Sequence, residues 1–370
     1  MEIKQLTLKN YRNYQPETIE FFDGINLLIG LNAQGKTNIV ESIFYLCTGF
    51  SPRAKKDAQL INDKADTAYI KGVANTIYGK TSVEIFFNKT DKKSIKIDGI
   101  TILKLGELME NMRAVYFSPQ ELKLVQEAPE DRRRFLNVSL CQMNKGYFYA
   151  LKRYNNIIEQ RNALLKNPDR SYVLNTLSFW DEQLAKEAAK IIYDRNNFIE
   201  SLIPFAKEIH KTLSLGKEEL NISSEQGFVG EIDDIKNNVY LALRSAVEKD
   251  IRLGYTTIGP HRDDLKITLN GKDVRFYGSQ GQQRTTALSI KLAETEIFNK
   301  EFKEYPILIL DDVFSELDKS RRECLIKMVQ NKQTIITATK VPPNLFKGIT
   351  YKKLVIDGGK VKSQKIMNLR

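Results

Sequence analysis

The sequence has few of the residues that form disulfide bonds in small proteins or bind zinc. Among its 370 residues are three cysteines and two histidines. Cys47, Cys141 and Cys324 lie far apart without a Cys-x-x-Cys pair, and His210 and His261 form no cluster with metal-ligand spacing. We therefore expect neither a disulfide framework nor a structural zinc site.

Long apolar runs are missing too. No stretch approaches the roughly 20 residues that a helix needs to cross a bilayer. Residues 1–8 form a polar, strand-like stretch and lack the features of a signal peptide. These absences predict a cytoplasmic protein with no membrane partner.

Acidic residues are fewer than basic ones. Lys and Arg number 57 against 46 Asp and Glu, which gives a formal net charge of +11. A surplus of this size favours a polyanionic partner, although a generally basic surface is the alternative. The surplus is dispersed, with small clusters at residues 53–56, 92–93, 132–134 and 321–322. Because no basic tail carries it, we expect a folded basic face.

The pattern of the chain changes twice. Residues 1–120 and 251–370 carry short alternating or apolar runs that predict strands. Residues 121–250 carry apolar side chains at spacings of three and four, which predict helices. No strict heptad persists there, so a compact helical lobe is favoured over an antiparallel arm or coiled coil. We predict an α/β domain built from both chain ends, with a mainly helical lobe inserted between them.

One segment has the spacing of a phosphate-binding loop, or Walker A motif. Residues 30–37 fit GxxxxGK[ST], follow an apolar strand and open an apolar-patterned helix. Backbone N–H groups and the helix N-terminus would surround the phosphates, Lys36 would reach the β- and γ-phosphates, and Thr37 would bind Mg²⁺. The predicted nucleotide-binding residues are Gly30, Leu31, Asn32, Ala33, Gln34, Gly35, Lys36 and Thr37.

An apolar strand at residues 307–310 ends in two carboxylates, Asp311 and Asp312. Such a Walker B pair is the expected partner of the loop, because the first aspartate holds Mg²⁺ and the second can activate the attacking water. A buried strand closed by a turn, the alternative, has no need of two adjacent acids. We predict Thr37 and Asp311 as metal-binding residues, and Lys36 and Asp312 as catalytic residues.

One tetrapeptide points to guanine instead of adenine. Asn88-Lys89-Thr90-Asp91 matches Asn-Lys-x-Asp, but no Asp-x-x-Gly lies between Thr37 and Asn88. The tetrapeptide joins two predicted strands, so we interpret it as a hairpin turn and expect ATP as the nucleotide. Asp98-Gly99 and Asn270-Gly271 predict two further hairpins.

The long interval between Lys36 and Asp311 favours the ATP-binding cassette (ABC) type of ATPase head. Residues 277–284 (YGSQGQQR) precede an apolar-patterned helix and resemble the ABC signature motif, and residues 315–318 resemble the D-loop. The resemblance implies that Ser279, with Gly281 and Gln282, binds the γ-phosphate of ATP on a second protomer, and that Ser279 is catalytic. A plain helix cap by Ser279 is the alternative.

Further segments resemble the RecF family of SMC-like ATPase heads. They are residues 8–14 (LKNYRNY), 117–125 (FSPQELKLV), 131–136 (DRRRFL) and 258–264 (IGPHRDD). The resemblance implies that Arg12 approaches the nucleotide phosphates. It also implies that Gln120 takes the Q-loop position, near both nucleotide and metal.

The same resemblance implies a function in recombinational DNA repair and replication restart. An ATP-dependent homodimer would bind duplex, gapped or junction DNA and help to load recombinase through RecR and RecO, with a link to the SOS response. Weak, DNA-stimulated ATP hydrolysis is expected. Asp312 stands where most ABC proteins carry glutamate, and the strand at residues 335–339 (IITAT) offers threonine where transporters carry a switch histidine.

Two other functions fit parts of the sequence. A transporter or SMC motor subunit would share the ATPase head, but an SMC protein needs hundreds of residues of heptads that this chain lacks. A non-enzymatic scaffold would bind ATP without turnover. Phosphate release measured with and without DNA discriminates between an ATPase and a scaffold.

Overall fold

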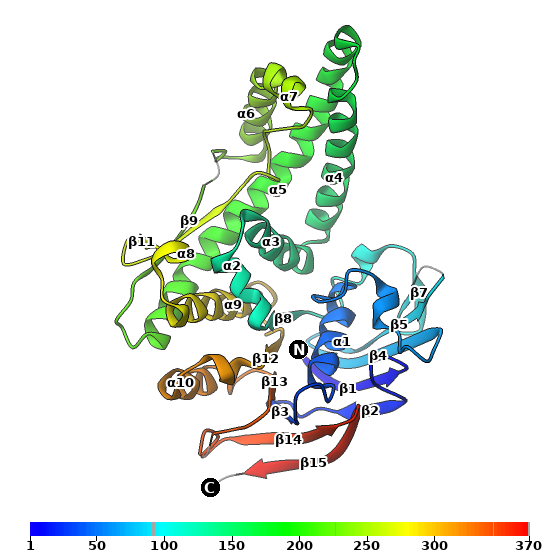
Figure 1. The fold of residues 1–370 in the computed structure, drawn as a ribbon, viewed down its shortest axis with the longest axis vertical. Coiled ribbons are helices and arrows are strands. Elements are labelled where there is room, and N and C mark those ends of the chain that lie inside the picture. Colours follow the sequence, from blue (N-terminus) through cyan, green and yellow to red (C-terminus); the bar gives the residue numbers. More distant parts are fainter. Residues whose placement is uncertain (91–92, 226, 343, 369–370) are drawn as a thin grey trace.

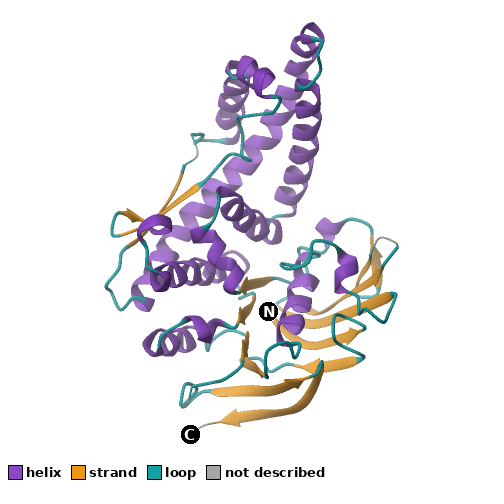
Figure 2. Cartoon of the chain, viewed as in Figure 1, coloured by secondary structure: helices purple, strands orange, loops and turns teal. Residues whose placement is uncertain are grey.

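The computed structural model describes residues 1–90, 93–225, 227–342 and 344–368. Figure 1 shows strands from both ends of the chain at one end of the molecule and helices from the middle of the chain at the other. Figure 2 shows the same separation by secondary structure. The helices formed by the described residues include none with the length and apolar character needed to cross a membrane.

A largely parallel sheet carries residues from both chain ends. Its order is β15 (Lys360–Asn368), β14 (Thr350–Asp357), β3 (Ile25–Ile29), β13 (Thr334–Ala338), β12 (Ile307–Asp311) and β8 (Ala114–Phe117). Only the β14–β15 pair is antiparallel among these described strands. β12 and β13 are buried along their whole length, as expected for a parallel sheet covered on both faces.

A second sheet is antiparallel and shares a core with the first. Its order is β2 (Glu17–Glu20), β1 (Glu2–Lys9), β4 (Thr67–Thr76), β5 (Gly79–Asn88), β6 (Ser94–Ile97) and β7 (Ile100–Ile102). The helix α1 (Lys36–Thr48) buries Ile39, Val40 and Ile43 in one apolar cluster with residues of both sheets. Short 3-10 helices follow at η1 (Asp57–Leu60) and η2 (Leu105–Glu107). The helix that opens at the predicted Walker A motif is therefore held on several sides.

The hairpins predicted from sequence are confirmed. β6 pairs with β7 around Asp98 and Gly99, which have positive φ angles of 49° and 82°. β10 (Leu265–Leu269) pairs with β11 (Lys272–Asp273) around Asn270 and Gly271 in the same way. β5 ends at Asn88 and pairs antiparallel with β6, as a turn at Asn88-Lys89-Thr90-Asp91 requires, although Asp91 lies outside the described residues.

The helical segment combines both arrangements considered from sequence. α4 (Lys145–Leu165) and the 44-residue α5 (Arg170–Leu213) form an antiparallel pair that projects from the sheets, and α6 (Ile232–Ser245) and α7 (Val247–Leu253) lie beside them (Figure 1). The expectation of a compact lobe was thus incomplete. Heptads are not required because α5 packs on α4 and α6 along the arm and on α9 (Gln280–Phe302) at its base.

The remaining elements lie between the arm and the parallel sheet or link strands β12 and β13 of that sheet. They are η3 (Pro119–Leu122), α2 (Lys123–Gln126), α3 (Pro129–Met143), β9 (Leu220–Ser224), α8 (Val274–Tyr277), η4 (Val313–Glu316) and α10 (Lys319–Val329). β9 pairs with β10, so a small sheet crosses the boundary proposed at residue 250. The lobe boundaries at residues 120 and 250 stay a prediction.

Candidate nucleotide-binding site

The Walker A loop is a tight turn from β3 into α1. Ala33 and Gly35 have positive φ angles of 63° and 110°. A Cβ on Gly35 would lie 2.9 Å from Asn13 and Tyr14 atoms, and one on Gly30 would lie 2.2 Å from the Ile356 carbonyl oxygen. Both positions therefore require glycine, as expected of a loop that wraps its backbone N–H groups around phosphates.

Lys36 folds back across this loop. Its Nζ donates to the carbonyl oxygens of Gly30 and Leu31, both at 2.8 Å. Burial lowers the pKa of Lys36, and the nearby Asp312 and Asp311 carboxylates oppose that shift. The ammonium group therefore lies in the concave side of the loop, beside the two Walker B acids.

Asp311 joins the Walker A helix to three strands. Its Oδ1 accepts hydrogen bonds from Thr37 Oγ1 at 3.1 Å and from Thr337 Oγ1 at 2.6 Å, and its Oδ2 accepts one from the Tyr116 hydroxyl at 3.0 Å. Burial raises the pKa of Asp311, while these hydrogen bonds lower it. The two predicted metal-binding residues, Thr37 and Asp311, thus lie in contact across 274 positions of sequence.

The donor set here fits Mg²⁺. Thr37 supplies a hydroxyl oxygen and Asp311 a carboxylate, which are hard oxygen ligands, and phosphate oxygens and water complete the usual Mg²⁺ shell. The described residues form no cluster of three or more His, Cys, Asp or Glu side chains suited to a metal. A nucleotide-bound Mg²⁺ needs no such cluster, because it takes few protein ligands.

Asp312 adopts a left-handed backbone conformation, with φ of 53°. Its N–H donates to Thr337 Oγ1 at 2.9 Å, and its Oδ2 accepts from Ser315 Oγ at 3.0 Å. A non-glycine residue with positive φ at the end of a buried strand is typical of a functional turn. The second Walker B carboxylate is therefore held by Ser315 of η4.

The signature segment forms the capped start of α9. Ser279 Oγ accepts from the Gln282 N–H at 3.3 Å, and Gln282 Oε1 accepts from the Ser279 N–H at 2.8 Å. This is the helix cap considered as the alternative from sequence. Ser279 and Gln280 are nevertheless exposed, and Gly281 is half-buried. In Figure 1, α8 and α1 lie on opposite sides of the central strands, so one chain does not bring its signature and Walker A segments together.

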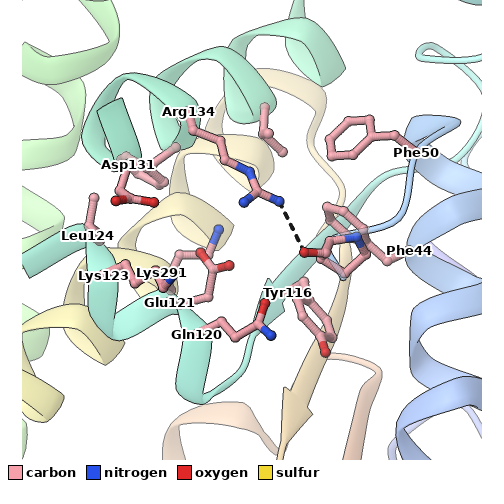
Figure 3. A pocket seen from close by; sticks show the side chains of 13 residues that line it. Phe44, Phe50, Tyr116, Gln120, Glu121, Lys123, Leu124, Asp131, Arg134 and Lys291 are labelled. Atoms are coloured by element: carbon pink, nitrogen blue, oxygen red, sulfur yellow. Dashed lines mark hydrogen bonds between the residues drawn. The ribbon is translucent and has the colours of Figure 1, made fainter. Parts of the chain in front are cut away.

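Arg12 and Gln120 are the two residues implied by family resemblance. Asn13, next to Arg12, donates to the Gln34 carbonyl of the Walker A loop at 3.2 Å. Arg12 Nε and Nη2 donate to the two Glu41 carboxylate oxygens at 3.0 and 2.8 Å, and Nη1 donates to the Gln59 carbonyl. Within the described chain, no hydrogen bond joins Arg12 to residues 30–37. Gln120 is exposed on η3 and lines a pocket with Tyr116 of β8, Phe44 of α1 and Arg134 of α3 (Figure 3).

Three residues that contact Asp311 or the helix α1 were not predicted from sequence. Tyr116 and Thr337 both hold Asp311, and Arg53 Nη1 donates to Asn38 Oδ1 at 3.2 Å on α1. Thr337 lies directly opposite Asp311 in the parallel β12–β13 register. Such partners follow from strand order, which the sequence does not reveal.

Comparisons with known proteins match most of the chain. Residues 2–345 match the family described as RecF/RecN/SMC N terminal domain. The "DNA replication and repair protein RecF" of Acetivibrio thermocellus is 42% identical over 344 residues, which cover 92% of this chain and 93% of that relative. The protein of the same name from Alkaliphilus oremlandii is 42% identical over 343 residues, with the same coverage of both chains.

Solved structures give the same result. A structure described as the recombination mediator protein RecF-ATPrS in the RecFOR pathway has a TM-score of 0.88 and 34% identity, and 97% of each chain is covered. A RecF-ATP structure of that pathway has a TM-score of 0.86 and 32% identity, and covers 100% of this chain and 97% of its own. An SMC head bound to a ScpA domain has a TM-score of 0.60 at 15% identity, with 100% and 98% covered, which shows a shared fold alone.

Proposed function

The chain belongs to the RecF family of DNA replication and repair proteins and has an ABC/SMC-type ATPase head, and from this premise we propose that it binds ATP and Mg²⁺, dimerises and acts on DNA in recombinational repair. The contact between Thr37 and Asp311 carries the proposal, because it joins the Walker A helix to the Walker B strand around hard oxygen ligands.

ATP binding follows from the groups that line the loop. The N–H groups of residues 30–37 and the α1 N-terminus bind the phosphates. When ATP binds, Lys36 would donate to phosphate oxygens in place of the two loop carbonyl oxygens. The new hydrogen bonds are stronger because the phosphate acceptors are charged and the carbonyl acceptors are neutral. Thr37 and Asp311 would hold Mg²⁺, and the ion would neutralise charge at the phosphates.

Hydrolysis is slow in this proposal. Asp312 is one methylene shorter than the glutamate of most ABC proteins, and its carboxylate is already hydrogen-bonded by Ser315 Oγ. A general base must reach the water it orients to within about 3 Å. Asp312 therefore meets this condition only when the nucleotide and the second protomer confine the water.

Two chains complete each site. Ser279 is exposed at the start of α9, and Figure 1 shows α8, which directly precedes it, far from α1, so a role at the Walker A loop of a second chain is proposed. A head-to-tail dimer brings each Ser279 to the partner's γ-phosphate, as in the ABC signature arrangement. ATP then favours the dimer and ADP does not, because the added contact requires the γ-phosphate.

DNA binding is assigned to the groove between the loop after α1 and helices α3 and α4. Arg133, Arg134 and Arg195 line it, opposed by Glu130 and Asp131. Arg134 is exposed, whereas burial and the neighbouring Arg195 lower the pKa of Arg133. Arg195 is already paired with Asp263, so the exposed Arg134 is the arginine of this groove best placed to contact a DNA phosphate.

The cellular role is inferred from family membership. The related structures are described as parts of the RecFOR pathway, so we propose RecR and RecO as partners in loading recombinase, with a link to the SOS response. A cytoplasmic location and DNA-stimulated hydrolysis belong to the same proposal.

Phosphate release with and without DNA tests the proposed ATPase. Wild-type protein should release phosphate slowly and faster with DNA, and Lys36→Ala should release none above background. Equal release by both proteins would refute the assignment. ATP binding without any release would favour the scaffold alternative.

A further inference from the structure

A chain of hydrogen bonds ties the start of α9 to the end of α5. Gln282 Nε2 donates to Glu218 Oε1 at 3.1 Å, and Glu218 Oε2 lies 3.1 Å from His210 Nε2. On the other side of the imidazole ring, His210 Nδ1 lies 3.1 Å from Ser289 Oγ. His210 belongs to α5, and Gln282 and Ser289 belong to α9, so Glu218 connects the two helices.

The series of hydrogen bonds ends at Ser279. Gln282 accepts from the Ser279 N–H through Oε1, while its own N–H donates to Ser279 Oγ. A side-chain amide has one accepting end and one donating end. Because Glu218 engages the donating end, the accepting end must face Ser279. Without Glu218, the amide of Gln282 is free to turn its NH₂ group toward the Ser279 N–H, which breaks the cap.

Burial distinguishes the two ends of this series of hydrogen bonds. His210 is fully buried and Glu218 is largely buried, whereas Ser279 is exposed. A bond between an amide and a buried carboxylate is charge-assisted and stronger than a neutral one. The rigid end therefore lies in the protein interior, and the end that it fixes faces outward.

We propose that Glu218 is a positioning residue for the signature turn: it sets the orientation of Gln282, and through Gln282 it holds Ser279 in place for the partner's ATP. This inference rests on the proposed trans role of Ser279. His210 lies near the C-terminal end of α5, whose 44 residues span about 66 Å. The same contact therefore joins the signature turn to the helical arm.

The test measures ATP-dependent dimerisation by sedimentation over a concentration series. Glu218→Ala should raise the protein concentration for half-dimerisation by up to about a hundredfold, since the dimer contains two signature turns and each loses a hydrogen bond to a charged group, worth about tenfold. Glu218→Gln should restore dimerisation to within about twofold of wild type, because its amide oxygen still accepts from Gln282. Binding of a fluorescent ATP analogue to dilute monomers should be unchanged in both variants.

Glu219→Ala is the matched control, because Glu219 is an exposed neighbour of the same charge. Among the described residues, its carboxylate accepts a single 3.5 Å hydrogen bond, from Asn221, and its two bonds to Asn270 use backbone atoms that the substitution keeps. It should dimerise as wild type does. A double-mutant cycle of Glu218→Ala and Gln282→Ala should be non-additive, which a general loss of stability would not produce.

Any one of three results would overturn the proposal. Glu218→Ala could dimerise as wild type does, the two substitutions of the cycle could have additive effects, or Glu218→Gln could fail to restore dimerisation. A different result would show that the proposed function itself is wrong: the Ser279→Arg variant would dimerise in ATP as wild type does.

Discussion

Replacing Tyr116 by Phe tests how the Walker B carboxylate is held. The Tyr116 hydroxyl donates to Asp311 Oδ2 at 3.0 Å, and both residues are buried, with 2% and 5% of their surfaces exposed. Tyr116→Phe keeps the ring that packs against Phe44 at a centroid distance of 5.4 Å. The fold should therefore persist while Asp311 loses one of its three donors.

The loss should appear in Mg²⁺-dependent nucleotide binding. A hydrogen bond to a charged group contributes about 1.5 kcal/mol, which corresponds to about a tenfold weaker affinity. We expect Tyr116→Phe to weaken binding of a fluorescent ATP analogue about tenfold with Mg²⁺ present and to leave Mg²⁺-free binding unchanged. Titration of the analogue at several Mg²⁺ concentrations measures both.

A second buried tyrosine supplies the control. The Tyr45 hydroxyl also donates to a carboxylate, that of Asp57, at 2.6 Å, and this pair lies outside the Walker A and B segments. Tyr45→Phe should leave the Mg²⁺ dependence unchanged. An equal Mg²⁺ dependence in Tyr116→Phe and wild type, with the same thermal unfolding midpoint, would refute the role given to the tyrosine.

Three further predictions concern hydrolysis and DNA. Lys36→Ala should abolish ATP binding in a nucleotide titration with an unchanged circular dichroism spectrum, because Nζ bonds only two loop carbonyls; retained binding would count against the Walker A assignment. Asp312→Asn should slow phosphate release about a hundredfold or more and accumulate the ATP-bound dimer, and normal turnover would exclude it as the base. Replacing Arg133 and Arg134 together by Ala should weaken DNA binding and reduce the slope of log affinity against log salt by about 2. The matched pair Lys360→Ala with Lys362→Ala, on β15, should leave the slope unchanged, and an equal loss in both pairs would contradict the proposed groove.

Local features of the fold were predictable from sequence because they depend on neighbouring residues. Hairpins followed from Asp98-Gly99 and Asn270-Gly271, which adopt positive φ angles. The Walker A strand and helix followed from an apolar run on either side of the glycine-rich loop. Each of these features requires only a few consecutive side chains.

Contacts across the fold were harder to predict. Tyr116 reaches Asp311 because β8 lies beside β12, and strand order is set by packing of the whole domain. Arg12 pairs with the buried Glu41, a contact that the local sequence does not reveal, and its approach to the phosphates stays a prediction. The role proposed for Ser279 requires a second chain, so the local sequence shows only its helix cap.

Sedimentation velocity of Ser279→Arg in ATP and Mg²⁺ tests the central claim most directly. The claim is that ATP joins two chains head to tail and that each Ser279 acts on the partner's nucleotide. Wild type should dimerise in ATP and stay monomeric in ADP, whereas Ser279→Arg should bind ATP and remain monomeric. Dimerisation of Ser279→Arg at the wild-type concentration would contradict the claim.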